Sequence, residues 1–206
     1  LPGHGASSSI DSDESMQSMA AKALDVLNHY ELEQFTIIGH SMGGYVGLEI
    51  LKQSTNCEQL ILLNSNFWED DETKRRDRDR VSNIVMKKKA SFIYEAIPNL
   101  FDDPTLFDNE VKALIAEAMH MTEDAIAICS QAMKSRSDYT DMVLDNSNRI
   151  TVIQGNHDPV VDRDKMRKLV GTSQIDYHEV ASGHMAHLEA RRDVNGILNK
   201  KITETN

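Results

Sequence analysis

Short runs of apolar, often β-branched residues recur along the chain, and each is followed by a polar or glycine-containing turn. Runs without polar alternation lie at 35–39, 59–64 and 150–155. Such runs are typical of strands that a parallel sheet buries on both faces. Residues 175–180 form a further expected strand. The pattern therefore predicts a mostly parallel sheet.

Helical periodicity occupies the spaces between these runs. Residues 12–30 carry apolar side chains at helical spacing, with acidic residues near the start. Residues 42–52 and 186–200 are also expected to be helical. A strand, a helix and a second strand over 35–64 make a βαβ unit. The expected fold class is therefore α/β, with helices on both faces of the sheet.

The middle of the chain has a different character. Residues 69–80 are nearly all charged with both signs mixed, which is typical of a solvated helix face. Residues 81–100 and 109–133 are expected to be helical, with breaks around Pro98 and Pro104. The pattern predicts no strand in this region.

The two kinds of pattern divide the chain into two expected units. Residues 1–66 and 149–206 form the α/β core, and residues 67–148 form a helical lid or cap inserted into it. A length of 206 residues fits one domain with such an insertion.

Composition excludes several functional classes. The chain has 22 Lys and Arg against 33 Asp and Glu, for a net charge of −11. Because this balance lacks the basic footprint of proteins that bind nucleic acid or anionic membranes, neither partner is expected. No apolar run approaches the ~18–20 residues of a membrane span. A hydrophobic content of 40% is enough for a sizeable core.

The cysteines and the first residues bear on the cellular compartment. Cys57 and Cys129 lie too far apart in sequence for a CxxC site, and two cysteines make no disulfide framework. This usage fits a reducing compartment, so a cytoplasmic location is expected. The chain opens at Leu1 with a Gly/Ser/Pro-rich stretch rather than a signal peptide.

A motif with catalytic chemistry follows the first expected strand. Residues 39–44 have the sequence GHSMGG, which fits G-x-S-x-G between a strand and a helix, the pattern of a nucleophile elbow. A turn this tight holds the serine in a strained conformation with its hydroxyl exposed, and the glycines allow neighbouring segments to approach closely. Ser41 is therefore the candidate nucleophile.

A serine nucleophile needs a general base. His184 follows the last expected strand and Asp158 follows an earlier buried strand, where α/β sheets place their catalytic groups. Asp158 would hold the imidazole of His184 in one tautomer and stabilise its cation. The chain order Ser41, Asp158, His184 differs from that of chymotrypsin and of subtilisin. His187 and Asp162 are the alternative base and acid.

The whole chain resembles the α/β-hydrolase superfamily, in its small esterase-like branch with a helical lid. The resemblance rests on LPGHG at 1–5, the elbow at 39–44, GNHD at 155–158 and SGH at 182–184. The branch includes carboxylesterases, acyl-carrier methyl-ester esterases, carbon–carbon bond hydrolases and haloperoxidase-like enzymes. A serine nucleophile argues against haloalkane dehalogenases and epoxide hydrolases, which use Asp.

The chain departs from that family at its front. Members carry further strands before the loop that residues 1–5 resemble, so N-terminal strands are expected to be missing from this sequence. The strand at 35–39 would then be an exposed apolar edge. The resemblance implies the Met42 backbone N–H as one oxyanion donor. The family's second donor comes from a loop that this sequence lacks.

Candidate substrate contacts lie near the elbow and after the second strand. His40 occupies the variable elbow position and is expected to pack beside the site. Phe67 and Trp68 lie where the insertion begins, and they either line an apolar acyl pocket or pack the insertion against the core. The sequence has no cluster with metal-ligand spacing and no phosphate loop, so no metal and no cofactor are expected.

The expected function is that of a serine hydrolase acting on an ester-like bond of a small acyl substrate. In this interpretation Ser41 attacks the carbonyl, His184 transfers the proton and Asp158 orients His184. Two alternatives stay open: a carbon–carbon bond hydrolase or lyase on the same triad, and a non-catalytic ligand-binding protein or inert fragment. The sequence also leaves the oligomeric state open.

Overall fold

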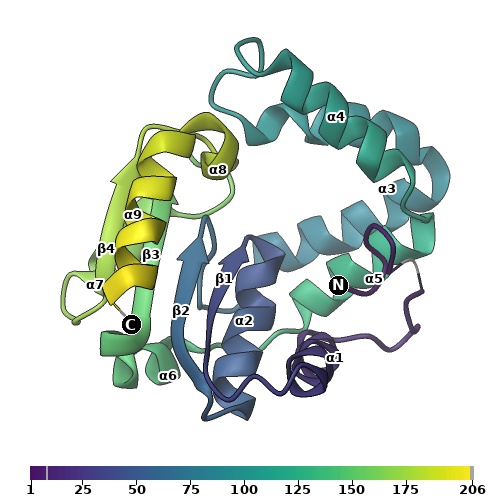
Figure 1. The fold of residues 1–206 in the computed structure, drawn as a ribbon. Coiled ribbons are helices and arrows are strands. Elements are labelled where there is room, and N and C mark those ends of the chain that lie inside the picture. The colour runs from purple at the N-terminus through teal and green to yellow at the C-terminus, as the bar shows by residue number, and fades with distance from the viewer. Residues whose placement is uncertain (8, 205–206) are drawn as a thin grey trace.

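The computed structural model describes residues 1–7 and 9–204. These residues form a four-stranded sheet in the order β1-β2-β3-β4, parallel throughout, with helices packed on both faces (Figure 1). This arrangement confirms the α/β fold class expected from the sequence. The strands are β1 (Phe35–His40), β2 (Cys57–Leu63), β3 (Ile150–Gly155) and β4 (Asp176–Val180).

A local capping interaction sets the start of the first core helix. The Ser15 side chain accepts the backbone N–H of Ser18 in a capping box, so the first helix begins at Met16 rather than at residue 12. The expected helix over 186–200 is divided at Ala190. The core helices are α1 (Met16–His29), α2 (Met42–Gln53), α7 (Arg163–Val170), α8 (Ala186–Glu189) and α9 (Arg191–Glu204).

The sheet separates two hydrophobic clusters. Leu60 and Leu62 of β2 join side chains of α1, α2 and α7, whereas Ile61 and Leu63 join side chains of α8 and α9. This alternation follows from the two-residue period of a strand. The middle of the sheet is therefore buried on both faces, which is why β2 and β3 have nearly continuous apolar sequences.

Between β2 and β3, the described residues form helices and no strand. We refer to residues 67–148 as the insertion. Figure 1 shows α4 of the insertion set apart from the sheet and across from α8, with α3 and α5 below α4 in this view. The division of the chain into two units stays a prediction. The helices are α3 (Glu72–Ala96, kinked at Lys88), α4 (Asp108–Met119), α5 (Glu123–Lys134) and α6 (Thr140–Asp145), with short 3-10 turns at Pro98–Leu100 and Ser147–Arg149.

Several sequence-based expectations are wrong in detail. The apolar run at 35–39 indicated burial on both faces, but Ile38 is 44% exposed because β1 lies at the edge of the sheet. This position confirms the exposed apolar edge that was expected if N-terminal strands are missing. The charged stretch is not entirely solvated, since Asp70 is buried against Arg78 and Arg136. The sequence pattern gave no bounds for α6 or α7. Within 1–7 and 9–204, no helix has both the length and the apolar character needed to cross a bilayer.

Candidate active site

The turn after β1 holds Ser41 in a conformation that few non-glycine residues adopt. Its φ of 50° and ψ of −120° place it just outside α2, which begins at Met42. A Cβ on Gly39 would lie 2.5 Å from the carbonyl oxygen of Gly43, so the turn requires glycine there. The Ser65 hydroxyl donates to the carbonyl oxygen of Ser41 at 2.8 Å. The turn therefore fixes Ser41 at the carboxyl end of the sheet.

Ser41, His184 and Asp158 form a continuous chain of hydrogen bonds. His184 Nε2 lies 2.9 Å from Ser41 Oγ. His184 Nδ1 lies 2.9 Å from Oδ2 and 3.0 Å from Oδ1 of Asp158. Because a carboxylate only accepts hydrogen bonds, Nδ1 carries the proton and donates it to Asp158. Nε2 of the neutral ring is then the acceptor for the Ser41 hydroxyl.

Further donors fix the Asp158 carboxylate. Its Oδ1 accepts the backbone N–H of Val160 at 2.7 Å. Its Oδ2 accepts the side-chain amides of Asn64 at 2.9 Å and Gln154 at 3.2 Å. Burial by itself raises the pKa of Asp158, but the hydrogen bond from His184, helped by those from Asn64 and the Val160 backbone, outweighs burial and lowers the pKa. The charged form that orients His184 is therefore favoured.

His40 supports the loop that carries His184. Its Nε2 donates to the backbone carbonyl oxygen of His184 at 2.8 Å. The His40 ring centroid lies 5.1 Å from that of His184 and 4.6 Å from that of His187. Burial lowers the pKa of His40 to about 4, so this ring is neutral at pH 7.

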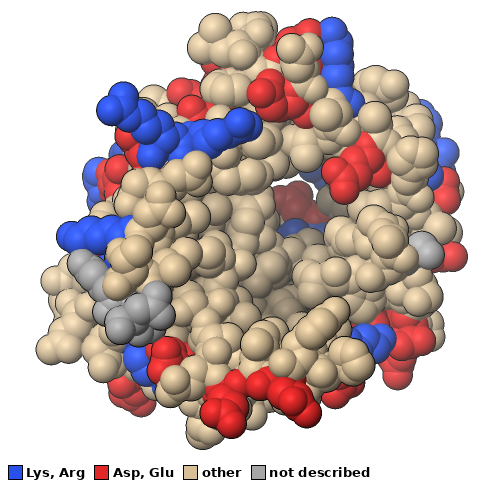
Figure 2. Space-filling model, in the orientation of Figure 1, with Lys and Arg blue, Asp and Glu red and all other residues tan. Residues whose placement is uncertain are grey.

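A cavity of about 620 Å³ opens over these groups. The core contributes Ser41, Met42, His40 and His184 to its wall, and the insertion contributes mainly apolar side chains of α3, α4 and α5. Figure 2 shows the molecule hollowed between the core and the insertion. In the part of the chain that the structure describes, no group of three or more His, Cys, Asp or Glu is placed to hold a metal ion.

Phe67 and Trp68 do not line this cavity, contrary to the expectation that they contact substrate. Both side chains are buried, and their rings meet edge to face at 5.5 Å. The backbone N–H of Tyr139 donates to the Phe67 carbonyl oxygen at 2.8 Å, and the Lys165 ammonium lies 4.6 Å from the Trp68 ring centroid. These contacts place both side chains between the insertion and the core. Their position matches the alternative that they pack the insertion against the core.

Three residues around the site were not predicted from the sequence. Asn64 and Gln154 hold Asp158, and Arg78 lines the cavity. Asn64 has a positive φ of 45° directly after β2, and a polar residue at the carboxyl end of a central strand was a usable signal. Arg78 lies within a run of charges, so nothing in the local sequence distinguishes it.

Curated relatives share part of the sequence. The chain is 26% identical over 118 residues to "Putative carbamate hydrolase RutD" of Acinetobacter baylyi, which covers 55% of this chain and 44% of that protein. The protein of the same name from Yersinia enterocolitica is 32% identical over 85 residues, covering 41% of this chain and 31% of that protein. The matched stretches span less than half the length of either relative.

Solved structures and a family model extend the comparison to nearly the whole chain. A thermophilic esterase from Thermogutta terrifontis superposes with a TM-score of 0.89 at 24% identity, covering 98% of this chain and 77% of that one. The enol-lactonase from Burkholderia xenovorans LB400 gives 0.83 at 16% identity, covering 98% and 78%. At sequence identities of 24% and 16%, these superpositions show that the fold is shared. The model of the "Alpha/beta hydrolase family" matches residues 1–197, and the chain therefore belongs to the alpha/beta hydrolase family.

Proposed function

We propose that this protein is a serine hydrolase that cleaves a carboxylic ester, or a similar acyl bond, of a small substrate. The observation that carries the proposal is the hydrogen-bonded chain from Ser41 through His184 to Asp158 beside the cavity. A neutral histidine whose Nδ1 is held by a carboxylate is an effective base for a serine hydroxyl. Membership of the alpha/beta hydrolase family supports the same chemistry.

The proposed reaction has two steps. Ser41 Oγ forms a bond to the acyl carbon while its proton passes to His184 Nε2; the leaving oxygen then separates and takes that proton. Water next attacks the acyl-enzyme and gives a proton to His184, and the product acid leaves as Ser41 regains its hydrogen. Asp158 keeps the ring oriented and stabilises the imidazolium in both steps.

The Met42 backbone N–H is the proposed donor to the oxyanion. It belongs to the first residue of α2, so it has no acceptor within the helix, and the positive end of the helix dipole lies there. Loss of one such donor typically costs about 10²–10³ in rate. The insertion would act as a lid, because its apolar side chains form the wall of the cavity opposite Ser41.

Labelling with a fluorophosphonate, read by intact mass, tests this proposal. A single adduct is expected on the wild-type protein and none on Ser41→Ala. Ser135→Ala is the matched control, because Ser135 is an exposed serine that does not line the cavity, and it should label like the wild type. Absence of an adduct on protein shown to be folded would contradict the proposal and favour a non-catalytic role.

A substrate screen then identifies the bond. Short-chain aryl esters are expected to be hydrolysed fastest. The names of the relatives, a carbamate hydrolase and an enol-lactonase, justify including an aryl carbamate and an enol lactone. Cleavage of a vinylogous diketone without any esterase activity would instead favour the carbon–carbon bond hydrolase alternative.

A further inference from the structure

Arg78, which lines the cavity, belongs to a cluster of charges with one cation in excess. The buried carboxylate of Asp70 is shared by two guanidinium groups. Arg78 Nε lies 3.1 Å from Oδ2 and Arg136 Nη1 lies 2.7 Å from Oδ1. One negative charge therefore faces two positive charges.

The two arginines are not equivalent. The Arg136 side chain is 1% exposed; it donates to the backbone carbonyls of Met133 and Trp68 and stacks 4.1 Å from the Tyr45 ring centroid. The Arg78 side chain is 20% exposed and lines the cavity. Arg136 is thus committed to the protein interior, and Arg78 carries the positive charge that the cavity can use.

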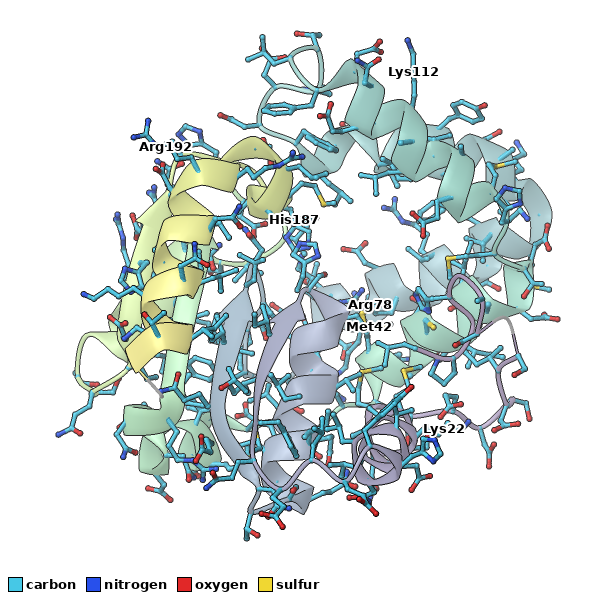
Figure 3. The ribbon with its side chains drawn as sticks, in the orientation of Figure 1. Lys22, Met42, Arg78, Lys112, His187 and Arg192 are labelled. Carbon is cyan, nitrogen blue, oxygen red and sulfur yellow. The ribbon has the colours of Figure 1, made fainter. Side chains whose placement is uncertain are left out.

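The Nη groups of Arg78 are available to a ligand. Among the residues that the structure describes, Arg78 donates a side-chain hydrogen bond only through Nε, to Asp70. Its backbone is fixed, because the hydroxyls of Ser82 and Ser130 both donate to its carbonyl oxygen, at 3.0 Å and 3.1 Å. Figure 3 shows Arg78 and Met42 at the border of the same opening, and both line the cavity.

The rest of the cavity offers Arg78 no buried counter-charge. Burial favours the neutral forms of His40 and Tyr45, lowering the pKa of His40 to about 4 and raising the pKa of Tyr45. Glu117 also lines the cavity, but it is exposed and borders a smaller cavity beside His120 as well. The remaining wall is mostly apolar, which strengthens the attraction of Arg78 for an anion.

We infer that the acyl half of the substrate ends in a carboxylate, which Arg78 binds while the acyl carbon lies at Ser41. This inference rests on the proposed function. The acyl half stays on the enzyme through both steps, first as part of the bound substrate and then as the acyl-enzyme. Arg78 can therefore hold a charge on it throughout the reaction. A planar guanidinium with free Nη groups suits a carboxylate, because it can donate two parallel hydrogen bonds.

A matched pair of esters tests the inference. The probes are mono-4-nitrophenyl adipate, which carries a free carboxylate, and its neutral methyl ester. The wild-type protein is expected to prefer the anionic ester by at least about tenfold in kcat/KM, an amount equal to ~1.4 kcal/mol. Added NaCl should reduce this preference, since salt screens the attraction. A preference for the neutral ester would overturn the inference.

Substitutions test whether Arg78 is responsible for the preference for the anionic ester. Arg78→Gln should lower the anionic-to-neutral ratio at least tenfold, mainly through KM, and Arg78→Lys should retain part of it because it keeps the charge. Asp70 keeps Arg136 as its partner in both variants. Arg76→Gln is the matched control, since Arg76 lies on the same helix, is exposed and pairs only with Glu72 among the described residues. An unchanged ratio in Arg78→Gln would overturn the inference.

A binding measurement separates this inference from the proposed function. Titration calorimetry of adipate against the wild-type protein needs no catalysis. If Ser41 proves unreactive, the proposed function fails, but adipate binding that is lost in Arg78→Gln and kept in Arg76→Gln would still support an anion site at Arg78. Absence of adipate binding to the wild-type protein would overturn the inference, even where simple esters are hydrolysed.

Discussion

The backbone N–H of His184 donates to the carbonyl oxygen of Leu100 at 2.7 Å. This bond joins the loop that carries the proposed base to the insertion. A second contact lies beside it, where the backbone N–H of Asp102 donates to Glu189 Oε2 at 2.8 Å. A displacement of the insertion at this point would therefore move His184 as well.

Gly183→Ala is expected to reduce activity more than stability. A Cβ on Gly183 would lie 2.6 Å from Asp102 N and 2.8 Å from Leu100 O, both backbone atoms, so the two segments must separate. His184 would then lose its bond to Leu100 and its alignment with Ser41. We expect kcat on an ester substrate to fall by roughly 10²-fold, as for a misplacement of about 1 Å.

Gly196→Ala is the control for that substitution. Gly196 lies in α9, and a Cβ there meets no atom within 4 Å. Alanine should leave kcat unchanged and raise stability by up to about 1 kcal/mol through its helix propensity. Equal kcat values for the two alanine variants would show that the contact between the insertion and the His184 loop does not affect catalysis.

Asn64→Gly is expected to lower kcat with little change in KM. The Asn64 amide donates to Asp158 Oδ2 at 2.9 Å and to the Gly183 carbonyl oxygen at 3.1 Å, so it positions both the acid and the His184 loop. A hydrogen bond to a charged group is worth about 1.5–3 kcal/mol. The expected loss in kcat is about 10–100-fold, measured by steady-state kinetics.

Asn64→Ala separates backbone strain from hydrogen bonding. Asn64 has a φ of 45°, which glycine adopts without strain and alanine does not. Both variants should lose similar activity, and the alanine variant should also be less stable by about 1 kcal/mol in urea denaturation. Full activity of the glycine variant would show that Asp158 needs no help from Asn64.

Stability is expected to rise with pH between about 4 and 6.5 because of His40. Burial lowers the pKa of His40 from 6.5 to about 4, so the unfolded chain binds a proton there that the folded protein does not. The contribution is complete above 6.5 and is lost as the pH falls toward 4, amounting to roughly 3 kcal/mol. Urea denaturation at several pH values measures it.

His40→Gln isolates this contribution from other titrating groups. His184, His187 and Asp158 also face His40, and the pKa of His187 is lowered by burial as well. Glutamine can still donate to the His184 carbonyl oxygen but does not titrate. The pH dependence of the free energy of unfolding should therefore be flatter in the variant, and an identical slope would refute the assignment.

Tyr139→Phe is expected to destabilise the protein by about 1–3 kcal/mol. The Tyr139 hydroxyl donates to Glu49 on α2, and both side chains are buried. Among the residues that the structure describes, its loss leaves the carboxyl group of Glu49 with only the Gln53 amide, at 3.3 Å. Tyr177→Phe is the matched control, because its acceptor Glu179 also pairs with Arg167 near the surface. Equal losses in thermal denaturation would contradict this account.

Local sequence determined the fold class and the position of the elbow. The apolar runs at β2 and β3 have the composition of strands buried on both faces, and the structure places them at the centre of the sheet. The strained turn at Ser41 depends on Gly39 and on the strand and helix that flank it. Such features depend on neighbours along the chain, so the sequence alone was sufficient to predict them.

Features that depend on contacts between segments distant in the sequence were decided by the tertiary structure. Ile38 is exposed although its run is apolar, because burial depends on the position of β1 in the sheet. The role of Arg78 depends on Arg136, which comes from beyond α5 and supplies the second cation on Asp70. No local pattern records such a pairing, because a charge is solvated or buried according to the groups that folding brings around it.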